Sequence, residues 1–239
     1  MDTRAPRTTV PLWPLPMLAA LMPFVVGHLA WWLSMRAELI PSCNLYWDGC
    51  VSISRAARFG AGNHLFRLVM LPCATVQAMV WLGATLWLRR TTREPVRLLP
   101  WLGLMAGAFL ALYATFLGTQ GEAYEAMRRY GINLYFGFTY LALLSVLRAL
   151  SRDGTRRAGY RPLLVVALGF MALGIATLVV RYTVDDATLF DRWENALEWH
   201  LGLWLTAMFA VLAWRWWREG LGVALRSGSV DTDDADEGG

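Results

Sequence analysis

The chain contains three histidines, and each lies beside or within a long apolar stretch: His28, His64 and His200. Three histidine ligands with one open position are a common arrangement for a zinc ion that activates water. One hypothesis is therefore a metal site formed by these histidines, with Asp48 or Glu198 as a further ligand or as the activating group. Zinc is the cofactor that this hypothesis implies, and a haem between His28 and His200 is its variant, although the sequence requires no cofactor.

Glu198 and His200 open the last apolar stretch, and an ionisable side chain within a membrane is costly enough to indicate a functional site. A second hypothesis makes these two residues catalytic, as the general base in acyl transfer or hydrolysis on a lipid. The sequence contains neither the GxSxG nor the HxxxxD motif that marks common enzymes of this kind. The sequence therefore leaves open whether the protein is an enzyme.

A third and simpler hypothesis is that the polar groups bind a lipid headgroup or one another. Arg67 and Arg129 are suited to phosphate, because a guanidinium group can donate two parallel hydrogen bonds. His64 is close to Arg67 in sequence, and Glu198 is expected to pair with either arginine. All these groups lie at one depth, the outer third of the expected membrane span.

The chain has three cysteines, of which Cys43 and Cys50 fall in one expected loop. They are suited to a disulfide in an oxidising compartment, and two free thiols are the alternative. Cys73 lies in an apolar stretch and is expected to be an inert core residue.

The elements that must position these residues are apolar helices. The chain is 56% hydrophobic with a mean hydropathy of +0.39, which is too apolar for an ordinary soluble domain. A helix that crosses the hydrocarbon layer needs about 20 apolar residues. Six windows satisfy this requirement, which predicts an all-α bundle of six transmembrane helices: 15–35, 65–88, 98–117, 133–150, 163–180 and 196–214.

The arginines predict the orientation, because cytoplasmic loops keep positive charge. The chain has no lysine. Its arginines gather before the first window and after the second, fourth and sixth windows. In the other loops, acidic residues accompany the arginines. Both termini are therefore expected in the cytoplasm. The arginines that carry this prediction are Arg4, Arg7, Arg89, Arg90, Arg93, Arg97, Arg152, Arg156, Arg157, Arg161, Arg215 and Arg218.

The exposed segments are unequal in length, and the longest is the expected outer loop 36–63. The outer loops 119–130 and 181–195 are of moderate length, so a site is expected on the outer face. We expect one domain over 1–226 and a disordered acidic tail over 227–239, which has no apolar periodicity. Gly103 and Gly107 form a small-residue face that favours close packing within the bundle over dimerisation.

Two short motifs resemble the FRAG–DRAM–SFK group of six-helix membrane proteins. The first is VSIS at 51–54 followed by NHLFR at 63–67, and the second is LEW at 197–199. The resemblance spans roughly residues 43–214. The group often has a histidine near the start of its fourth helix, where this chain has RRYG at 128–131.

This resemblance implies work on lipids, since members of the group include a Golgi protein needed for fatty-acid remodelling of lipid anchors. The matching positions are Ser52, Ser54, Arg67 and Glu198. The resemblance therefore adds the two serines to the candidate headgroup contacts. It also implies six helices with cytoplasmic ends and a long first outer loop.

The sequence thus predicts a multi-pass protein of a bacterial-type inner (plasma) membrane that remodels or organises lipids from the outer side. Membrane lipids are the expected partners, and nucleic acid is not, because arginines facing an anionic leaflet account for the basic pI. A scaffold that recruits a protein partner through its cytoplasmic loops is the alternative. A metal-dependent lipid hydrolase and a homo-oligomer are further alternatives. A transporter is disfavoured, because no charges or broken helices occupy paired midmembrane positions.

Overall fold

The computed structural model describes residues 9–92, 96–152 and 159–224. Within these ranges six helices are long and apolar enough to cross a membrane. A single-turn helix and two short strands complete the structure. The elements are β1 (Thr9–Pro11), α1 (Pro14–Arg36), α2 (Ile53–Ala56), α3 (Gly60–Thr91), α4 (Leu99–Phe116), α5 (Glu122–Arg152), α6 (Tyr160–Thr183), α7 (Ala187–Arg218) and β2 (Gly222–Ala224).

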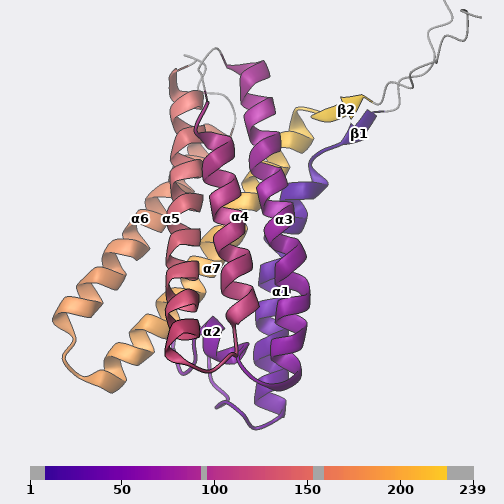
Figure 1. Ribbon diagram of the computed structural model, residues 1–239. Helices are drawn as coiled ribbons and strands as arrows, with labels where there is room; N and C mark the ends of the chain where they lie inside the picture. Colours follow the sequence, from indigo (N-terminus) through magenta and orange to yellow (C-terminus); the bar gives the residue numbers. More distant parts are fainter. Residues whose placement is uncertain (1–8, 93–95, 153–158, 225–239) are drawn as a thin grey trace, which may run out of the picture.

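The helices form a bundle in which neighbours in sequence are mostly neighbours in space. α3 packs against α1 and α4, and α4 packs against α5. α7 crosses the bundle obliquely, packing against α1 and α6, while α6 leans outward together with the first turns of α7 (Figure 1). We call the end that carries α2 the cap end, and the end that carries β1 and β2 the terminal end (Figure 1).

All six predicted windows are helical, but α5 and α7 begin well before the windows that predicted them. α5 starts at Glu122 and α7 at Ala187, and α6 runs to Thr183, so most of the expected loops 119–130 and 181–195 is helical. Polar residues support these added turns. Glu125 and Arg129 form an i,i+4 ion pair, and the Asp186 carboxylate caps α7 by accepting from the backbone N–H of Leu189. Hydropathy detects the hydrocarbon-crossing part of a helix and misses turns that extend into water.

The first and last described segments of the chain meet in a small antiparallel sheet at the terminal end. β1 pairs with β2, with Thr9 opposite Ala224 and Pro11 opposite Gly222. These two segments therefore lie side by side at one end of the bundle. The sequence predicted only that both termini share one side of the membrane, and not that the segments pair. Some of the sequence expectations fall outside the described residues. These are the acidic tail 227–239 and five of the arginines used to predict the orientation: Arg4, Arg7, Arg93, Arg156 and Arg157.

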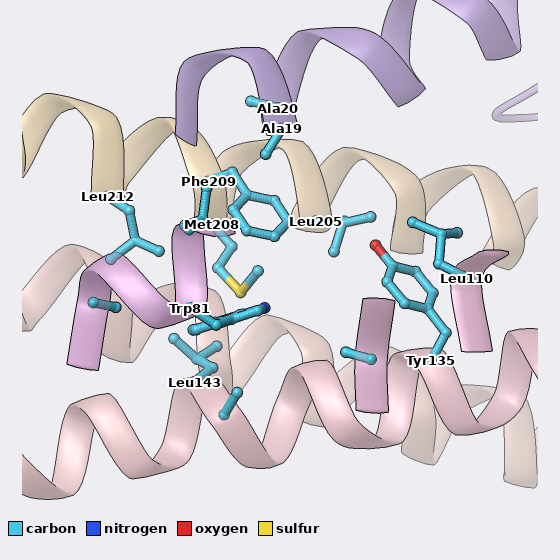
Figure 2. Packing of buried hydrophobic residues seen from close by; sticks show 14 of the residues in the cluster. Ala19, Ala20, Trp81, Leu110, Tyr135, Leu143, Leu205, Met208, Phe209 and Leu212 are labelled. Carbon is cyan, nitrogen blue, oxygen red and sulfur yellow. The ribbon is translucent and has the colours of Figure 1, made fainter. Parts of the chain in front are cut away.

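The core is held by large aromatic rings packed against small residues. The rings of Trp81 and Phe209 lie 5.8 Å apart at their centres, with Ala19 and Ala20 of α1 beside Phe209 (Figure 2). Lipid tails are as apolar as leucine, so close packing rather than removal from water stabilises such a bundle. Gly103 of α4 faces the Trp81 side chain, in keeping with the packing role predicted for the Gly103–Gly107 face.

Arg215 departs from its expected place on an exposed cytoplasmic surface. Its side chain is only 5% exposed, and it pairs with Glu219 and lies over the Trp87 ring, 5.8 Å from the ring centre. The Trp87 indole N–H also donates to the Glu219 carboxylate. Arg215 therefore closes the terminal end of the core instead of facing water.

Candidate functional site

The cap end is closed by the segment 37–59, which includes α2. Cys43 and Cys50 form the disulfide that their spacing suggested. Between them the side chain of Asn44 accepts from the N–H groups of Tyr46 and Trp47, at 3.1 and 3.3 Å. Such side-chain turns are the usual local preference of asparagine. The result is a compact loop that presents Tyr46 toward the bundle.

Loss of this disulfide should loosen the cap without unfolding the bundle. The loop that it closes is short, so its removal should cost about 2–3 kcal/mol on the chain-entropy scale. We expect dithiothreitol to lower the melting temperature of the purified protein by about 5–10 °C. The Cys43→Ser/Cys50→Ser variant should melt at this lower temperature with or without dithiothreitol. An equal effect of reductant on that variant would assign the effect elsewhere.

Three side chains on one face of α7 hold the cap by its backbone. Positions 192, 195 and 199 follow the i, i+3, i+7 spacing that lines up side chains on a helix. The three donors are Arg192 Nε, Asn195 Nδ2 and Trp199 Nε1, each 2.9 Å from the carbonyl oxygens of Asp48, Gly49 and Val51, respectively. The sequence expectations do not include this contact, although the spacing of these polar groups along the helix is a signal for it.

Glu198 connects the same helix to α2. Its Oε1 atom accepts from the backbone N–H of Ser54 at 3.1 Å. Ser52 caps α2 by accepting from the N–H of Arg55 at 3.1 Å, and its hydroxyl lies 3.1 Å from that of Ser54. The structure thus brings together Ser52, Ser54 and Glu198, three of the four residues singled out by the family resemblance.

A cavity of about 60 Å³ lies beneath the cap, between α1, α3, α4, α5 and α7. This volume holds several water molecules or a short piece of a larger molecule. Most of its walls are aliphatic and aromatic. The polar groups among its lining residues are few, and they are His28, Tyr46, Tyr113, Tyr135 and Glu198.

His28 and Tyr46 form a fixed pair on the cap side of this cavity. His28 Nδ1 lies 2.7 Å from the carbonyl oxygen of Phe24, so it must carry the proton and donate. Nε2 lies 2.9 Å from the Tyr46 hydroxyl, so both ring nitrogens make hydrogen bonds. Burial raises the pKa of Tyr46, which keeps that hydroxyl protonated. These two hydrogen bonds fix the orientation of the imidazole ring and leave neither ring nitrogen free.

The far side of the cavity continues into a buried polar chain. The Tyr135 hydroxyl donates to Gln77 Oε1 at 2.9 Å, and Gln77 Nε2 lies 3.6 Å from the Cys73 sulfur. Tyr113 also lines the cavity, is only 3% exposed, and makes no hydrogen bond through its hydroxyl within the described residues. Tyr113 can therefore donate to a molecule in the cavity.

Arginines that the sequence analysis did not select lie close to the cavity. Burial lowers the pKa of Arg58, and the like charges of Arg128 and Arg55 lower it further. Its Nε atom is buried without a hydrogen-bond partner in the described part of the chain. The charges of Arg58 and Arg128 act on Tyr113, and those of Arg55 and Arg58 act on Glu198. Arg55 pairs with Asp191 at 3.6 Å, and Arg128 donates to the carbonyl oxygen of Thr119, so Arg58 is the guanidinium of the three that is left for an anion.

The arginines that the sequence analysis did select lie elsewhere. Arg129 is exposed and pairs with Glu125 at 3.2 Å, so it does not pair with Glu198 as expected. Arg67 is absent from the residues that line the cavity, and no ion pair of the described chain includes it. The structure therefore replaces Arg67 and Arg129 with Arg55, Arg58 and Arg128 as the cations that act on the site.

The three histidines are not brought together. His28 lines the cavity, and His200 donates through Nδ1 to the carbonyl oxygen of Ala196 at 2.8 Å, with its ring edge-on to Tyr46. His64 is exposed on the first turns of α3. Across residues 9–92, 96–152 and 159–224 no group of three or more His, Cys, Asp or Glu side chains is placed to hold a metal ion. The three-histidine hypothesis is therefore not supported.

Comparison with models of protein families, with curated proteins and with solved structures finds no match. The function of the site is accordingly argued from its own chemistry. That chemistry combines a carboxylate, hydroxyl donors and nearby guanidinium groups around an apolar cavity.

Proposed function

We propose that the chain is a multi-pass protein of a bacterial-type plasma membrane that binds a phospholipid or glycolipid at its cap end and takes part in lipid remodelling. The single observation that carries this proposal is the position of Glu198. Its carboxylate faces an apolar cavity within the bundle while Ser54 holds it by one oxygen. A polar group carried on an apolar molecule is the natural ligand for such a place.

The membrane topology rests on two features. Six helices are long and apolar enough to cross a bilayer, and the described chain ends pair at one end of the bundle. That terminal end carries Arg89, Arg90 and Arg97, and positive charge favours the cytoplasmic side. The cap end then faces outward. An outward cap also suits its disulfide, because such bonds persist in oxidising compartments.

The two parts of a lipid headgroup match the two polar parts of the site. A hydroxyl or amine can donate to Glu198, whose Oε2 atom is free of hydrogen bonds within the described structure, and can accept from Tyr113. A phosphate can bind Arg58, whose Nε lacks a partner within the described residues and whose charge is reinforced by Arg55 and Arg128 nearby. The apolar walls then contact the glycerol and the first methylene groups.

Lipid remodelling, rather than binding alone, follows from the same carboxylate. A carboxylate can take the proton of a lipid hydroxyl while that oxygen attacks the acyl ester of a second lipid, and it can return the proton to the alcohol released from that ester. The resemblance of Ser52, Ser54 and Glu198 to the FRAG–DRAM–SFK group supports the same class of function. The His28–Tyr46 pair is fixed by its own hydrogen bonds, so its role is to shape the site.

Native mass spectrometry of the detergent-purified protein tests this proposal. We expect wild type to retain a phospholipid or glycolipid, and Glu198→Gln and Arg58→Gln each to retain at least about tenfold less, since a hydrogen bond to a charged group stabilises by about 1.5–3 kcal/mol. Arg67→Gln/Arg129→Gln is the matched control and should retain lipid like wild type.

The outcomes separate the hypotheses. Loss of lipid only in the control variant would restore the arginines selected from sequence. Equal retention by all variants that fold would exclude a headgroup site at the cap end and would favour the scaffold alternative. Far-ultraviolet circular dichroism and melting temperature, measured on each variant, identify any loss that reflects unfolding.

A further inference from the structure

A second and larger concave surface lies at the terminal end, on the opposite side of the bundle from the cap. It is a groove of about 500 Å³ between the segment that leads into α4 and the last turns of α5. One wall is formed by Val96, Arg97, Leu98 and Leu99, and the other by Ser145, Arg148, Ala149 and Arg152. None of the lining residues is acidic.

The α5 wall is a single helix face. Positions 145, 148, 149 and 152 are related by three, four and seven residues, which places them in one row. Arg148 and Arg152 therefore stand one turn apart on the same side of α5, with Arg97 on the opposite wall. Arg97 and Arg148 are both exposed. Arg152 takes part in other interactions, so Arg97 and Arg148 are the two cations of the groove that a ligand can contact.

Apolar side chains beside the charges place this groove at a membrane surface. Leu98 is 70% exposed and Trp101, on the first turn of α4, is 65% exposed. Tryptophan favours the depth of lipid headgroups, and an exposed leucine next to it favours contact with acyl chains. The groove thus offers guanidinium groups toward water and apolar contacts toward the hydrocarbon. A soluble anion would use only the first of these.

We infer that this groove binds an anionic phospholipid of the cytoplasmic leaflet, whose phosphate contacts Arg97 and Arg148. Basic pockets between membrane helices on this side are suited to anionic headgroups, because the leaflet concentrates them and the helices fix the cations. Guanidinium groups on two facing walls can contact phosphate oxygens from two directions. The inference does not depend on the site at the cap end, which lies at the other end of the bundle.

The test measures lipid-dependent thermal stability of the full chain in a neutral detergent. The probes are phosphatidylglycerol, phosphatidylcholine and soluble glycerol phosphate, each titrated against wild type, Arg97→Gln/Arg148→Gln and Arg89→Gln/Arg90→Gln. The last variant is the matched control. It removes the same charge from exposed positions at the same end of the bundle but outside the groove.

We expect phosphatidylglycerol alone to raise the melting temperature of wild type and of the control variant. The groove variant should bind it about thirtyfold more weakly, given the contribution of each arginine near an anionic surface. Arg97→Lys/Arg148→Lys restores the positive charge and should recover part of the affinity. The melting temperature of the groove variant without lipid shows whether it is folded.

Three results would overturn the inference. Equal weakening in the groove and control variants would show a diffuse attraction of the basic end to anionic lipid. Stabilisation by glycerol phosphate to the same degree as by phosphatidylglycerol would show a site for a free phosphate compound. Unchanged affinity in a folded groove variant would show that this groove is not the binding site.

Discussion

Replacement of Gly49 by alanine is expected to detach the cap from α7 and to abolish lipid retention at the cap end. Gly49 has a φ of +57°, where an L side chain is strained by about 1–2 kcal/mol. An added Cβ would also overlap the carbonyl oxygen of Arg192 and lie 2.8 Å from its carbonyl carbon. Because both contacts are backbone, neither helix nor loop can adjust by a rotamer change. We expect a total cost of about 3–5 kcal/mol.

Gly60→Ala is the matched control for this prediction. Gly60 has the same φ of +57°, but its added Cβ would meet only a flexible Leu39 methyl group at 3.5 Å. It should lower the melting temperature by a few degrees and leave lipid retention intact. Should the two variants behave alike, backbone strain alone would explain the effect, and the tight contact of the cap with α7 would have no special role.

Gly103→Ala is expected to destabilise the whole bundle. The added methyl would overlap the Trp81 side chain, lying 2.6 Å from its Cγ atom, and Trp81 is fully buried. The ring cannot move aside, because Phe209 lies against it (Figure 2). Overpacking of this kind costs about 1–3 kcal/mol or more. We expect a fall in melting temperature of about 10 °C, measured by circular dichroism in detergent.

The control for Gly103 is a glycine with open space around it. An added Cβ at Gly137 of α5 would meet no atom within 4 Å. Alanine favours a helix over glycine by up to about 1 kcal/mol, so Gly137→Ala should keep or raise the melting temperature. A stable Gly103→Ala variant would show that α3 and α4 can separate at this point without cost.

The helices were predictable because each contains an apolar run long enough to cross a membrane, and hydropathy detects such runs. The added turns of α5 and α7 were not, since Glu122 and Asp186 begin them in charged sequence that hydropathy assigns to loops. β1 and β2 have three residues each, too few for any periodicity. Their pairing depends on the bundle bringing these two segments, far apart in the sequence, together.

The candidate site was predictable in part. Glu198 and His28 were selected because ionisable groups in apolar stretches are rare, and both line the cavity. Arg58 was missed because it lies in a polar loop, where nothing in the sequence distinguishes it from a solvated arginine. Its burial results from contacts between segments far apart in the chain. Arg67 was selected for its neighbours in sequence, and these do not determine which way a helix presents its side chains.

The hydrogen bonds that hold the cap have a consequence for biosynthesis. Asp48 and Gly49 bond to residues 144 and 146 positions later, so the cap lacks its partners until α7 has been translated. The disulfide between Cys43 and Cys50 spans only seven positions and can close long before then. A nascent chain therefore passes through a stage in which helices α1 to α6 exist and the cavity has no α7 wall. The site is completed last, and a chain that stops short of α7 lacks Glu198 altogether.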